Sequence, residues 1–599
     1  MKIKVSDYIS NFFVKKKMFH VFGVTGGGAM HLNDSFAKSK KLKFIIFHHE
    51  QSASMAADAF YRKKQTPCVL HTTSGPGATN SLTGVSGAWI DSIPMFVVSG
   101  QVPTNDMIKK NSSRQIGVQE INIIDLVKPI TKYAISIKNE NYIDFYLNKC
   151  FNKMINGKPG PVWLDVPLDI QSKIINTKKL KKMKNDLVKY DDNINLKFIE
   201  KQINNSSKPV IVIGNGIHIS KSEKLFIKFL NKLKIPVISS WNASDIIETK
   251  NKLYVGRMGI FGDRASNFAV ENCDLLIVLG SRLSIPQTGY KTFEFAKYSK
   301  KIIIDIDSKE FKNKKFNKII YRKNTDLKFF LNKANKYFEN RNLKKFNNWI
   351  SLVNYWKNKY PVAQPLNKKD KEKINSFYFI DVLSDCLKGN ETIVTDMGTS
   401  FTCTMQGLKI KNSKNQRLFT SSGLAAMGFG LPGAIGGYFA KEKNKIICVT
   451  GDGGLMFNIQ ELQTVKSYKI PMKIFVLENQ GYLTMKLMQK KNFNLLVGST
   501  KSSGLSFPNI KKIANSYSMK YFKLRKSNLR NQLKNILKIK TPTIIEVNMP
   551  PFQPLIPRTQ NKLLPDGTFI TPKLDDLFPF LSKKILNEER LKAKKIKNG

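Results

Sequence analysis

The stretch KIICVTGDGGLMFNIQELQTVKSYKIPMKIFVLENQGY, residues 445–482, decides the fold of this chain. It begins with a β-branched run that ends at Gly451-Asp452-Gly453, and after 25 further residues a second such run ends at Asn479. The pattern between them predicts a helix over about Ile459 to Tyr468. A strand, a crossover helix and a second strand form the βαβ unit of a buried parallel sheet. Both polar residues are therefore predicted at the carboxyl ends of strands, where open α/β sheets bind ligands.

The same alternation of short β-branched runs, glycine-containing turns and helix-like stretches occurs in three segments of the 599 residues. We therefore predict an α/β protein with three successive doubly wound parallel-sheet domains. A Lys- and Asn-rich stretch at about 173–195 indicates a linker. The expected divisions are a first domain at 1–172, a central domain at 195–345, a third domain at 373–550 and a C-terminal arm at 551–599.

The composition argues against several classes of protein. The 99 Lys and Arg residues outnumber the 44 Asp and Glu residues, for a formal charge of +55, but they are spread along the chain, so we expect no nucleic-acid partner. The alternative of a basic nucleic-acid-binding protein would require steeply salt-dependent DNA binding. The six cysteines form no C-x-x-C pair and no apolar run is long enough to span a bilayer, so no zinc site, disulfide framework or membrane partner is expected. The start, MKIKVSDYISNFF, lacks the apolar core of a signal peptide, and we expect a cytoplasmic location.

Asp452 and Asn479 have the chemistry of a magnesium site. A carboxylate, an amide oxygen and a nearby backbone carbonyl are hard oxygen ligands for an ion that completes its octahedron with phosphate oxygens. Gly453 and Gly454 follow at the turn, where backbone N–H groups can approach a phosphate closely. The tripeptide Gly-Asp-Gly alone indicates only a strand-to-helix turn, and it is the spacing to Asn479 that favours the metal site.

This spacing resembles the cofactor signature of the thiamine-diphosphate enzymes. The resemblance implies that Asp452, Asn479 and the main-chain carbonyl of Gly481 hold the magnesium ion that bridges the diphosphate. It also implies a pyrimidine-binding first domain, a central domain and a diphosphate-binding third domain. The family often has a second Asn where this chain has Glu478, a departure that leaves the ligand Asn479 in place.

Two further segments of the third domain match the family. Gly398-Thr399-Ser400 follows the apolar run ETIVTD and would supply hydroxyl groups and close backbone to the diphosphate. SSGLAAMGFGLPGAIGG, residues 421–437, is similar to the family segment whose Met bends the cofactor from beneath. The resemblance therefore assigns Gly423 to cofactor binding and Met427 to that wedge, although a buried Met is more often simply part of a core.

The first domain supplies the other half of the implied site. Glu50 comes directly after an apolar run, and a carboxylate at a buried strand end is a candidate site residue. The resemblance implies that Glu50 donates to the ring nitrogen of the aminopyrimidine and so favours its imino tautomer. TSGPGATNSLTGVSGAWIDSIPMFVVSGQVP, which begins at the implied cofactor-binding residue Thr73, narrows the resemblance to acetolactate synthases. Gln119 stands where these enzymes bring a catalytic Phe-Gln pair to the cofactor, with Val118 in place of the Phe.

The resemblance implies a transferase that decarboxylates a 2-oxo acid such as pyruvate and adds the two-carbon unit to a second carbonyl, as in branched-chain amino acid biosynthesis. The family's decarboxylases place paired histidines near the loop after GQVP, and their absence here favours ligation. The alternative is a related lyase or synthase that acts on an oxygenated or sugar-derived substrate, which Thr484, His31 and the long loop at 106–118 support. The acceptor and the pathway stay open.

Acetolactate synthases bind FAD in the central domain without using its redox chemistry. Gly214-Asn215-Gly216, Arg282 and Asp305-Ile306-Asp307 fall at compatible positions, but Leu283-Ser284-Ile285-Pro286 replaces the family's acidic stretch. Because G-x-G alone is a weak signal, FAD binding stays open. The resemblance also implies a homo-oligomer, a dimer or a tetramer, whose sites are shared between subunits, and it leaves open a regulatory subunit.

Overall fold

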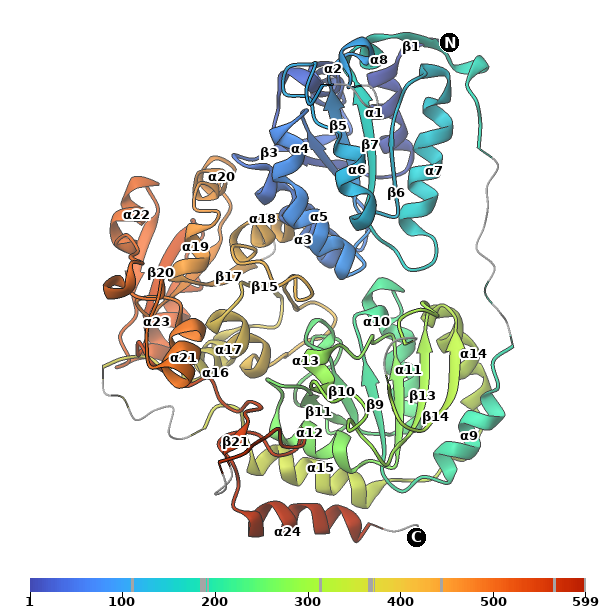
Figure 1. Ribbon diagram of the computed structural model, residues 1–599. Coiled ribbons are helices and arrows are strands. Elements are labelled where there is room, and N and C mark those ends of the chain that lie inside the picture. The colour runs from blue at the N-terminus through green and yellow to red at the C-terminus, as the bar shows by residue number, and fades with distance from the viewer. Residues whose placement is uncertain are drawn as a thin grey trace.

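The structure is a computed structural model that describes residues 1–108, 113–183, 190, 193–311, 315–364, 370, 372–441, 445–563 and 567–596. Figure 1 shows three α/β domains, with the first at the top, the central one at the lower right and the third at the left. Each domain contains one six-stranded sheet in which every strand pair is parallel. The predicted α/β fold with three doubly wound parallel sheets is confirmed.

The strands of the three sheets are given in spatial order. The first sheet consists of β3 (Lys43–Ile46), β2 (His20–Gly23), β4 (Val69–Thr72), β5 (Phe96–Gln101), β7 (Val162–Pro167) and β6 (Tyr133–Ser136). The central sheet consists of β11 (Tyr254–Arg257), β10 (Val237–Ser239), β9 (Pro209–Ile213), β12 (Leu275–Leu279), β13 (Lys300–Asp305) and β14 (Ile319–Asn324). The third sheet consists of β16 (Arg417–Phe419), β15 (Glu391–Thr395), β17 (Lys445–Gly451), β18 (Lys473–Glu478), β20 (Thr543–Asn548) and β19 (Lys520–Lys523).

Helices connect these strands and cover both faces of each sheet. Those of the first domain are α1 (Val5–Lys15), α2 (Met30–Lys38), α3 (Glu50–Lys64), α4 (Pro76–Asn80), α5 (Leu82–Ile90), α6 (Ile123–Val127), α7 (Ile143–Ile155) and α8 (Leu168–Ser172). The central domain contributes α9 (Leu196–Asn204), α10 (Gly216–Ile219), α11 (Glu223–Leu233), α12 (Arg264–Asn272), α13 (Ile285–Thr288), α14 (Leu327–Phe338) and α15 (Asn347–Lys359). The third domain contributes α16 (Ser376–Cys386), α17 (Thr399–Gly407), α18 (Gly430–Ala440), α19 (Asp452–Met456), α20 (Glu461–Ser467), α21 (Leu483–Phe493), α22 (Ile510–Ser516) and α23 (Leu529–Ile536).

In each sheet the strand order reverses beside the first strand of the domain. The chain adds one strand, or two in the central domain, on one side of that first strand and then returns to its other side. These reversals lie between β2 and β4, between β9 and β12, and between β15 and β17. Ligands of open α/β sheets bind in the crevice that opens at such a point. The three crevices therefore mark where the candidate site residues of each domain should be sought.

The first and third domains share one hydrophobic core. Helix α3 packs on α18, and buried side chains of both domains form a single cluster that includes Phe60 and Ile435. The helices approach so closely that a Cβ atom added at Gly436 would lie 2.0 Å from the carbonyl oxygen of Ala56. Only a glycine fits at this contact, so the short residues of both helices set the relative position of the two domains.

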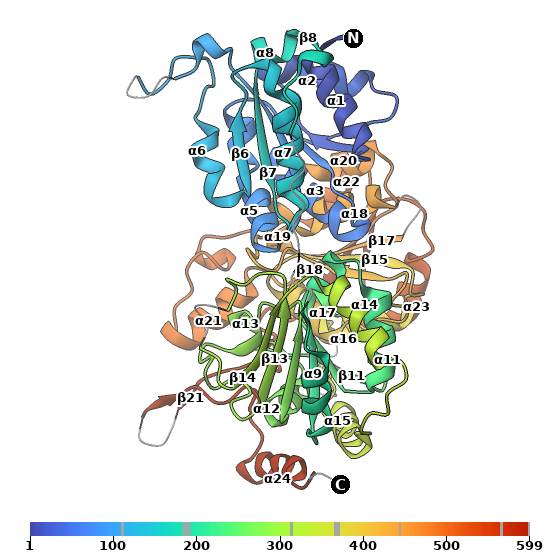
Figure 2. The same ribbon diagram turned by 90° about the vertical axis from the view of Figure 1, so that its right-hand side faces the viewer.

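The central domain extends beyond the expected end at residue 345, and the arm packs on it. Helix α15 buries Trp349, Val353 and Trp356 in the core of the central domain. Helix α24 (Lys583–Lys594) of the arm contacts α12 and α15, and Trp356 donates a hydrogen bond to the buried Glu589 at 2.9 Å. Figure 2 shows α24 beneath the central sheet. The arm is therefore part of the central domain's core, which the Lys-rich sequence did not suggest.

Two short strands tie the start of the chain to the region after residue 172. Strand β1 (Lys2–Lys4) pairs antiparallel with β8 (Ile174–Asn176), so ordered structure of the first domain continues into the expected linker. Residues 184–189 and 191–192 of that linker, and residues 109–112 of the loop at 106–118, lie outside the described residues. A search of the described helices finds none that is both long and apolar enough to cross a membrane.

The contact between α3 and α18 yields a matched pair of substitutions. Gly436→Ala places a methyl group against the Ala56 carbonyl and should cost about 1–3 kcal/mol, seen as a lower melting temperature in calorimetry. Gly437→Ala is the control, because its Cβ would meet nothing closer than the Thr392 methyl at 3.3 Å and alanine favours a helix by up to ~1 kcal/mol. Equal melting temperatures for the two variants would contradict the close contact.

Candidate functional site

The third domain brings Asp452 and Asn479 together at the carboxyl ends of β17 and β18. Asp452 is the first residue of α19 and is buried. One oxygen of its carboxylate accepts the backbone N–H of Gly453 at 2.8 Å, and the other accepts the N–H groups of Asn479 at 3.1 Å and of Gly481 at 3.2 Å. The carboxylate thus fixes the loop after β18 to the end of β17.

Asn479 is held from both sides of its backbone, and its amide oxygen is left for a ligand. Its N–H donates to Asp452, and its carbonyl accepts a hydrogen bond from the ammonium of Lys486 at 2.8 Å. The side-chain Oδ1 of Asn479 is buried and has no hydrogen-bond partner in the structure. An unsatisfied buried acceptor costs free energy, so its position beside a buried carboxylate fits a bound cation.

The backbone at Gly481 can be formed only by glycine. Its φ is +139°, and a Cβ atom there would lie 2.0 Å from the carbonyl oxygen of Ser499. Among the described residues, no group of three or more His, Cys, Asp or Glu side chains could hold a metal ion. A metal at this edge would therefore depend on Asp452 together with amide and carbonyl oxygens, a donor set that suits Mg²⁺.

Asp396, at the end of β15, organises the neighbouring loops, and the sequence analysis did not single it out. Its carboxylate accepts the backbone N–H groups of Met397 at 2.7 Å and Gly428 at 2.9 Å and the hydroxyl of Thr450 at 3.0 Å. Burial raises the pKa of this carboxyl, and these donors offset part of the effect. Asp396 therefore joins the ends of β15 and β17 to the segment that contains Met427.

Gly398-Thr399-Ser400 begins α17 at this same edge. Gly398 has a φ of +75° and caps the helix, and Thr399 and Ser400 are buried. The Ser400 hydroxyl donates to the carbonyl of Met397 at 2.9 Å, so it also holds its own turn. Gly453 and Gly454 begin α19 next to β15, where a Cβ atom at Gly454 would lie 2.8 Å from Asp396.

Met427 lies in the irregular segment that precedes α18 and is half-buried. Two residues before it, Ala425 has a φ of +60°, a conformation that L-residues rarely adopt. Gly428, which follows Met427, is hydrogen-bonded through both of its backbone groups. Its N–H donates to Asp396, and its carbonyl accepts from Asn458 at 2.8 Å. The structure thus brings Met427 to the edge that carries the candidate metal ligands.

The first domain gathers Glu50, Thr73 and Gln119. Glu50 is the buried first residue of α3, and its carboxylate accepts a hydrogen bond from Asn80 at 3.0 Å. A Cβ atom at Gly77 would lie 2.7 Å from the Thr73 side chain and 3.3 Å from Glu50, so these two residues are neighbours. The carbonyl of Gln119, whose φ is +60°, packs against Gly75 in the same turn.

A buried amide links this group to the third domain within one chain. Asn458 accepts hydrogen bonds from the hydroxyl of Ser52 at 2.9 Å and the amide of Gln51 at 3.3 Å, and it donates to Gly428. The backbone N–H of His48 donates to Glu461 at 3.2 Å. The start of α3, and with it Glu50, is therefore held against the segment that carries Met427. The sequence analysis missed this link because Asn458 lies 407 residues from Gln51 and 406 from Ser52 along the chain.

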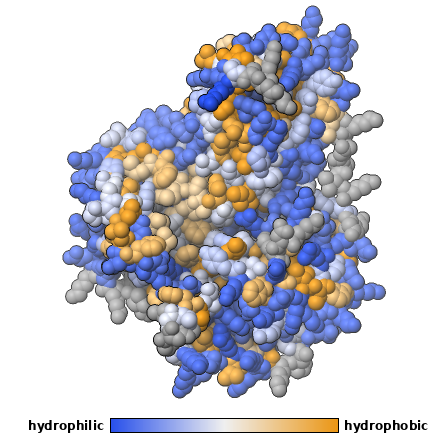
Figure 3. Space-filling model, in the orientation of Figure 1, coloured by the Kyte–Doolittle hydropathy of each residue, from blue (hydrophilic) through white to orange (hydrophobic). Residues whose placement is uncertain are grey.

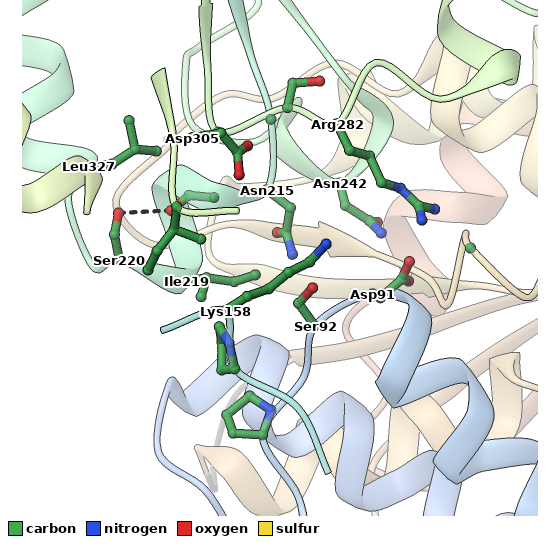
Figure 4. Close-up of a pocket in the computed structure, with 18 of the residues that line it drawn as sticks. Asp91, Ser92, Lys158, Asn215, Ile219, Ser220, Asn242, Arg282, Asp305 and Leu327 are labelled. Atoms are coloured by element: carbon green, nitrogen blue, oxygen red, sulfur yellow. Dashed lines mark hydrogen bonds between the residues drawn. The ribbon is translucent and has the colours of Figure 1, made fainter. Parts of the chain in front are cut away.

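Gly423 lies apart from both groups, in the wall of a cavity of about 560 Å³ where the three domains meet. A Cβ atom at Gly423 would lie 2.4 Å from Asp91 and 3.2 Å from Arg282. Figure 4 shows side chains from the first and central domains, among them Lys158, Asn215 and Arg282, around this cavity. Its central-domain wall is the crevice between β9 and β12, with Gly214, Asn215, Gly216, Arg282, Asp305 and Ile306 among the lining residues.

Lys158 reaches across the cavity rim from the first domain to the central domain. Its ammonium lies 3.0 Å from Asp307 and 2.8 Å from Glu310. At the floor, burial raises the pKa of Asp305 to about 6. The cavity combines glycine-lined strand ends, basic side chains and a carboxylate, which are the groups that bind the phosphates and ribose of a nucleotide.

Comparison with known proteins agrees with this arrangement. Three models of thiamine pyrophosphate (thiamine diphosphate) enzymes match the chain: the N-terminal TPP binding domain over residues 3–124, the central domain over 196–327 and the C-terminal TPP binding domain over 396–547. The acetolactate synthase large subunit of Cyanidium caldarium is 30% identical over 552 residues, which cover 89% of this chain and 91% of the relative. Acetolactate synthase 2, chloroplastic, of Nicotiana tabacum is 30% identical over 584 residues, 94% of this chain and 84% of the relative. The chain therefore belongs to the thiamine pyrophosphate enzyme family and is an enzyme of the acetolactate synthase type.

Proposed function

We propose that the protein decarboxylates pyruvate, or a close 2-oxo acid, and transfers the two-carbon unit to the carbonyl group of a second 2-oxo acid. The observation that carries the proposal is the buried, unpartnered amide oxygen of Asn479 beside Asp452, at the strand edge where the family model for the C-terminal TPP binding domain matches. The curated relatives reported above are named acetolactate synthases, which favours this reaction over the alternative with an oxygenated or sugar-derived substrate.

The residues of the third domain would hold the cofactor. Asp452, Asn479 and the carbonyl of Gly481 would bind Mg²⁺, while the backbone at Gly398 and Gly454 would bind the diphosphate. When bound, thiamine diphosphate supplies the carbon nucleophile that attacks the 2-oxo acid and takes up the electron pair released with CO₂. Met427 would support the cofactor from below, as its half-buried position permits.

The first domain would manage protons. Glu50 is buried and its second oxygen is occupied by Asn80, so the carboxyl is positioned to share a proton with a ring nitrogen in a site from which water is largely excluded. Gln119 lies in the adjoining turn and would contact the substrate. Thr73 has a buried hydroxyl without a partner in the structure, which supports a polar ligand at this edge.

We further propose FAD as the ligand of the 560 Å³ cavity. The cavity has the size of a small-molecule site and carries Arg282 for phosphate and Asp305 for ribose hydroxyls. Leu283 to Pro286, which replace the acidic stretch expected from the family, do not block it, because Ser284 and Pro286 themselves form part of its wall.

We propose a homodimer, alone or paired into a tetramer, in which the two halves of each site come from different subunits. Apolar side chains are exposed on the third domain, and Figure 3 shows hydrophobic surface over that domain at the left of the view. The exposed residues are Leu424, Phe457, Met485, Met488, Phe493, Leu495 and Val497, with Ile116 and Val118 on the first domain. Large exposed apolar patches mark interaction sites, and these residues lie close in sequence to Met427, α19 and Gln119 or on α21 and the loop after it, which follow Gly481. Because the relative from Cyanidium caldarium is named a large subunit, we also propose a smaller regulatory subunit as a partner of this chain.

The reaction is tested by incubating the protein with pyruvate, thiamine diphosphate and Mg²⁺ and measuring acetolactate, acetaldehyde and remaining pyruvate together. We expect acetolactate as the main product, at half a mole for each mole of pyruvate consumed, because the loop after GQVP, residues 104–119, has no histidine pair to protonate the two-carbon unit. Acetaldehyde as the only product would contradict the carboligase.

The metal ligands are tested by cofactor titration. Asp452→Ala and Asn479→Ala should each weaken thiamine diphosphate binding about 10-fold or more at limiting Mg²⁺, with partial recovery as Mg²⁺ is raised, because each removes an oxygen ligand. Asn390→Ala, at an exposed Asn of the same domain, is the control. Unchanged calorimetric affinity in both ligand variants would show that the metal lies elsewhere.

Subunit sharing is tested by mixing two inactive variants. Glu50→Gln removes a carboxyl of the first domain and Asp452→Ala a ligand of the third, so a mixed dimer would hold one doubly damaged site and one intact site. We expect activity to return after subunit exchange, up to about half the wild-type value for each mixed dimer. Proven exchange without recovery would mean that each site is built within one chain.

A further inference from the structure

A second cavity, of about 200 Å³, lies between the central domain and the C-terminal arm. It is separate from the three strand-edge crevices described above. The segment that follows α13 forms one wall, and residues 571–574 of the arm form the other. The backbone of Thr559 donates to the carbonyl of Ile260 at 2.8 Å, and the amide of Asn267 donates to the carbonyl of Leu574 at 2.9 Å. The arm is thus fastened on two sides of the cavity.

Charged groups of both signs line this cavity. Glu271, in the last turn of α12, is half-buried, and its carboxylate accepts the backbone N–H of Ala296 at 3.2 Å. Lys291 and Lys573 line the cavity from exposed positions, and Glu294, which is paired with Lys297, lines it too. The lining therefore offers a carboxyl at Glu271 and two ammonium groups at Lys291 and Lys573, a layout that suits a ligand with one charge of each sign.

The other carboxylates near Glu271 are engaged in ion pairs. Glu294 lies 2.8 Å from Lys297, and Asp575 forms two hydrogen bonds with Arg590, at 2.7 and 2.9 Å. The buried Lys301 donates to the carbonyls of Ala296, Ser299 and Asn317. Burial, with a contribution from Asp575, raises the pKa of Glu271 to about 8. The ionised form of Glu271 is therefore disfavoured in the free protein, and a ligand cation beside it would stabilise that form.

We propose that this cavity binds a small zwitterion, an amino acid being the simplest case, with its ammonium group against Glu271 and its carboxylate toward Lys291 and Lys573. The apolar side chains of Ile260, Phe295 and Leu574 line the remaining surface and would receive a short aliphatic group. A volume of about 200 Å³ lies below the range of drug-sized sites, which limits the ligand to a small molecule.

A ligand here would stabilise the docked arm. Both the central domain and the arm line the cavity, so binding favours the state in which they are together. Helix α13 separates this cavity from the larger one, because Ser284, Pro286 and Gln287 line the larger cavity and Thr288 lines the smaller. The proposed ligand would therefore sit one short helix away from the candidate nucleotide site.

The test uses ligand-detected NMR titration of the full chain with L-alanine, and with propionate and n-propylammonium as probes of each single charge. We expect saturable binding of L-alanine at about millimolar concentration and at least 10-fold weaker binding of both probes. Propionate or n-propylammonium binding as tightly as L-alanine would overturn the zwitterion assignment. No saturable binding of L-alanine would overturn the site.

Two variants locate the binding. Glu271→Gln removes the carboxyl that would ionise against the ammonium, and Thr571→Trp, at an exposed position on the arm wall, fills the mouth without disturbing the core. Both should weaken L-alanine binding at least 10-fold, while Glu339→Gln, an exposed acidic residue elsewhere in the central domain, should leave it unchanged. Unchanged affinity in both Glu271→Gln and Thr571→Trp would place the binding elsewhere and overturn the proposal.

Discussion

The close contact between α3 and α18 is the constraint on which the rest of the structure depends. At Gly436 the two helix backbones touch with no room for a methyl group, so the first and third domains are fixed to each other by shape rather than by a flexible surface. Glu50 begins one of these helices, and the segment with Met427 leads into the other. Because the helices cannot slide, the first turn of α3 stays hydrogen-bonded through Asn458 to Gly428.

Two buried carboxylates, those of Asp396 and Asp452, then fix the conformation of the loops at the ends of the strands. Asp396 and Asp452 each accept three hydrogen bonds from backbone N–H groups or a hydroxyl, and each joins segments that are distant in sequence. Burying a carboxylate costs free energy, and its hydrogen bonds offset that cost only when every partner is in place. The consequence is a rigid edge at which Asn479 Oδ1 is buried without a hydrogen-bond partner.

Periodicity and motif spacing predicted the part of the molecule that follows local rules. Strand runs that end in glycine and the 25-residue interval between Gly453 and Asn479 were enough for the α/β class, the three sheets and the edge that carries the candidate ligands. Lys486, Asp396 and Asn458 were missed because their partners are backbone groups or residues far away in sequence, which no pattern reveals. Gly423 fell within a recognised segment, yet the chain turns there toward Asp91 and the central domain. The packing of the arm at 551–599 was not predicted, because its many exposed lysines obscure the few apolar residues, Leu574, Leu586 and Ala593, that join the central core.

A buried ion pair also links the three domains. It favours one relative arrangement of the domains but adds little to the free energy of unfolding. Arg417 of the third domain lies 2.6 Å from Asp245 of the central domain and donates to the carbonyl of Arg62 in the first. Burial opposes the ionisation of Asp245, but Arg417 and His218 outweigh it and lower its pKa to about 2. A buried ion pair roughly repays its own desolvation, whereas a misplaced domain would leave one charge buried alone at a cost of about 3–5 kcal/mol. Arrangements of the domains that separate Arg417 from Asp245 are therefore disfavoured. Tyr61 and Gln65, which lie next to Arg62 in the first domain, line the large cavity. The same ion pair thus helps to fix the wall to which the proposed nucleotide would bind.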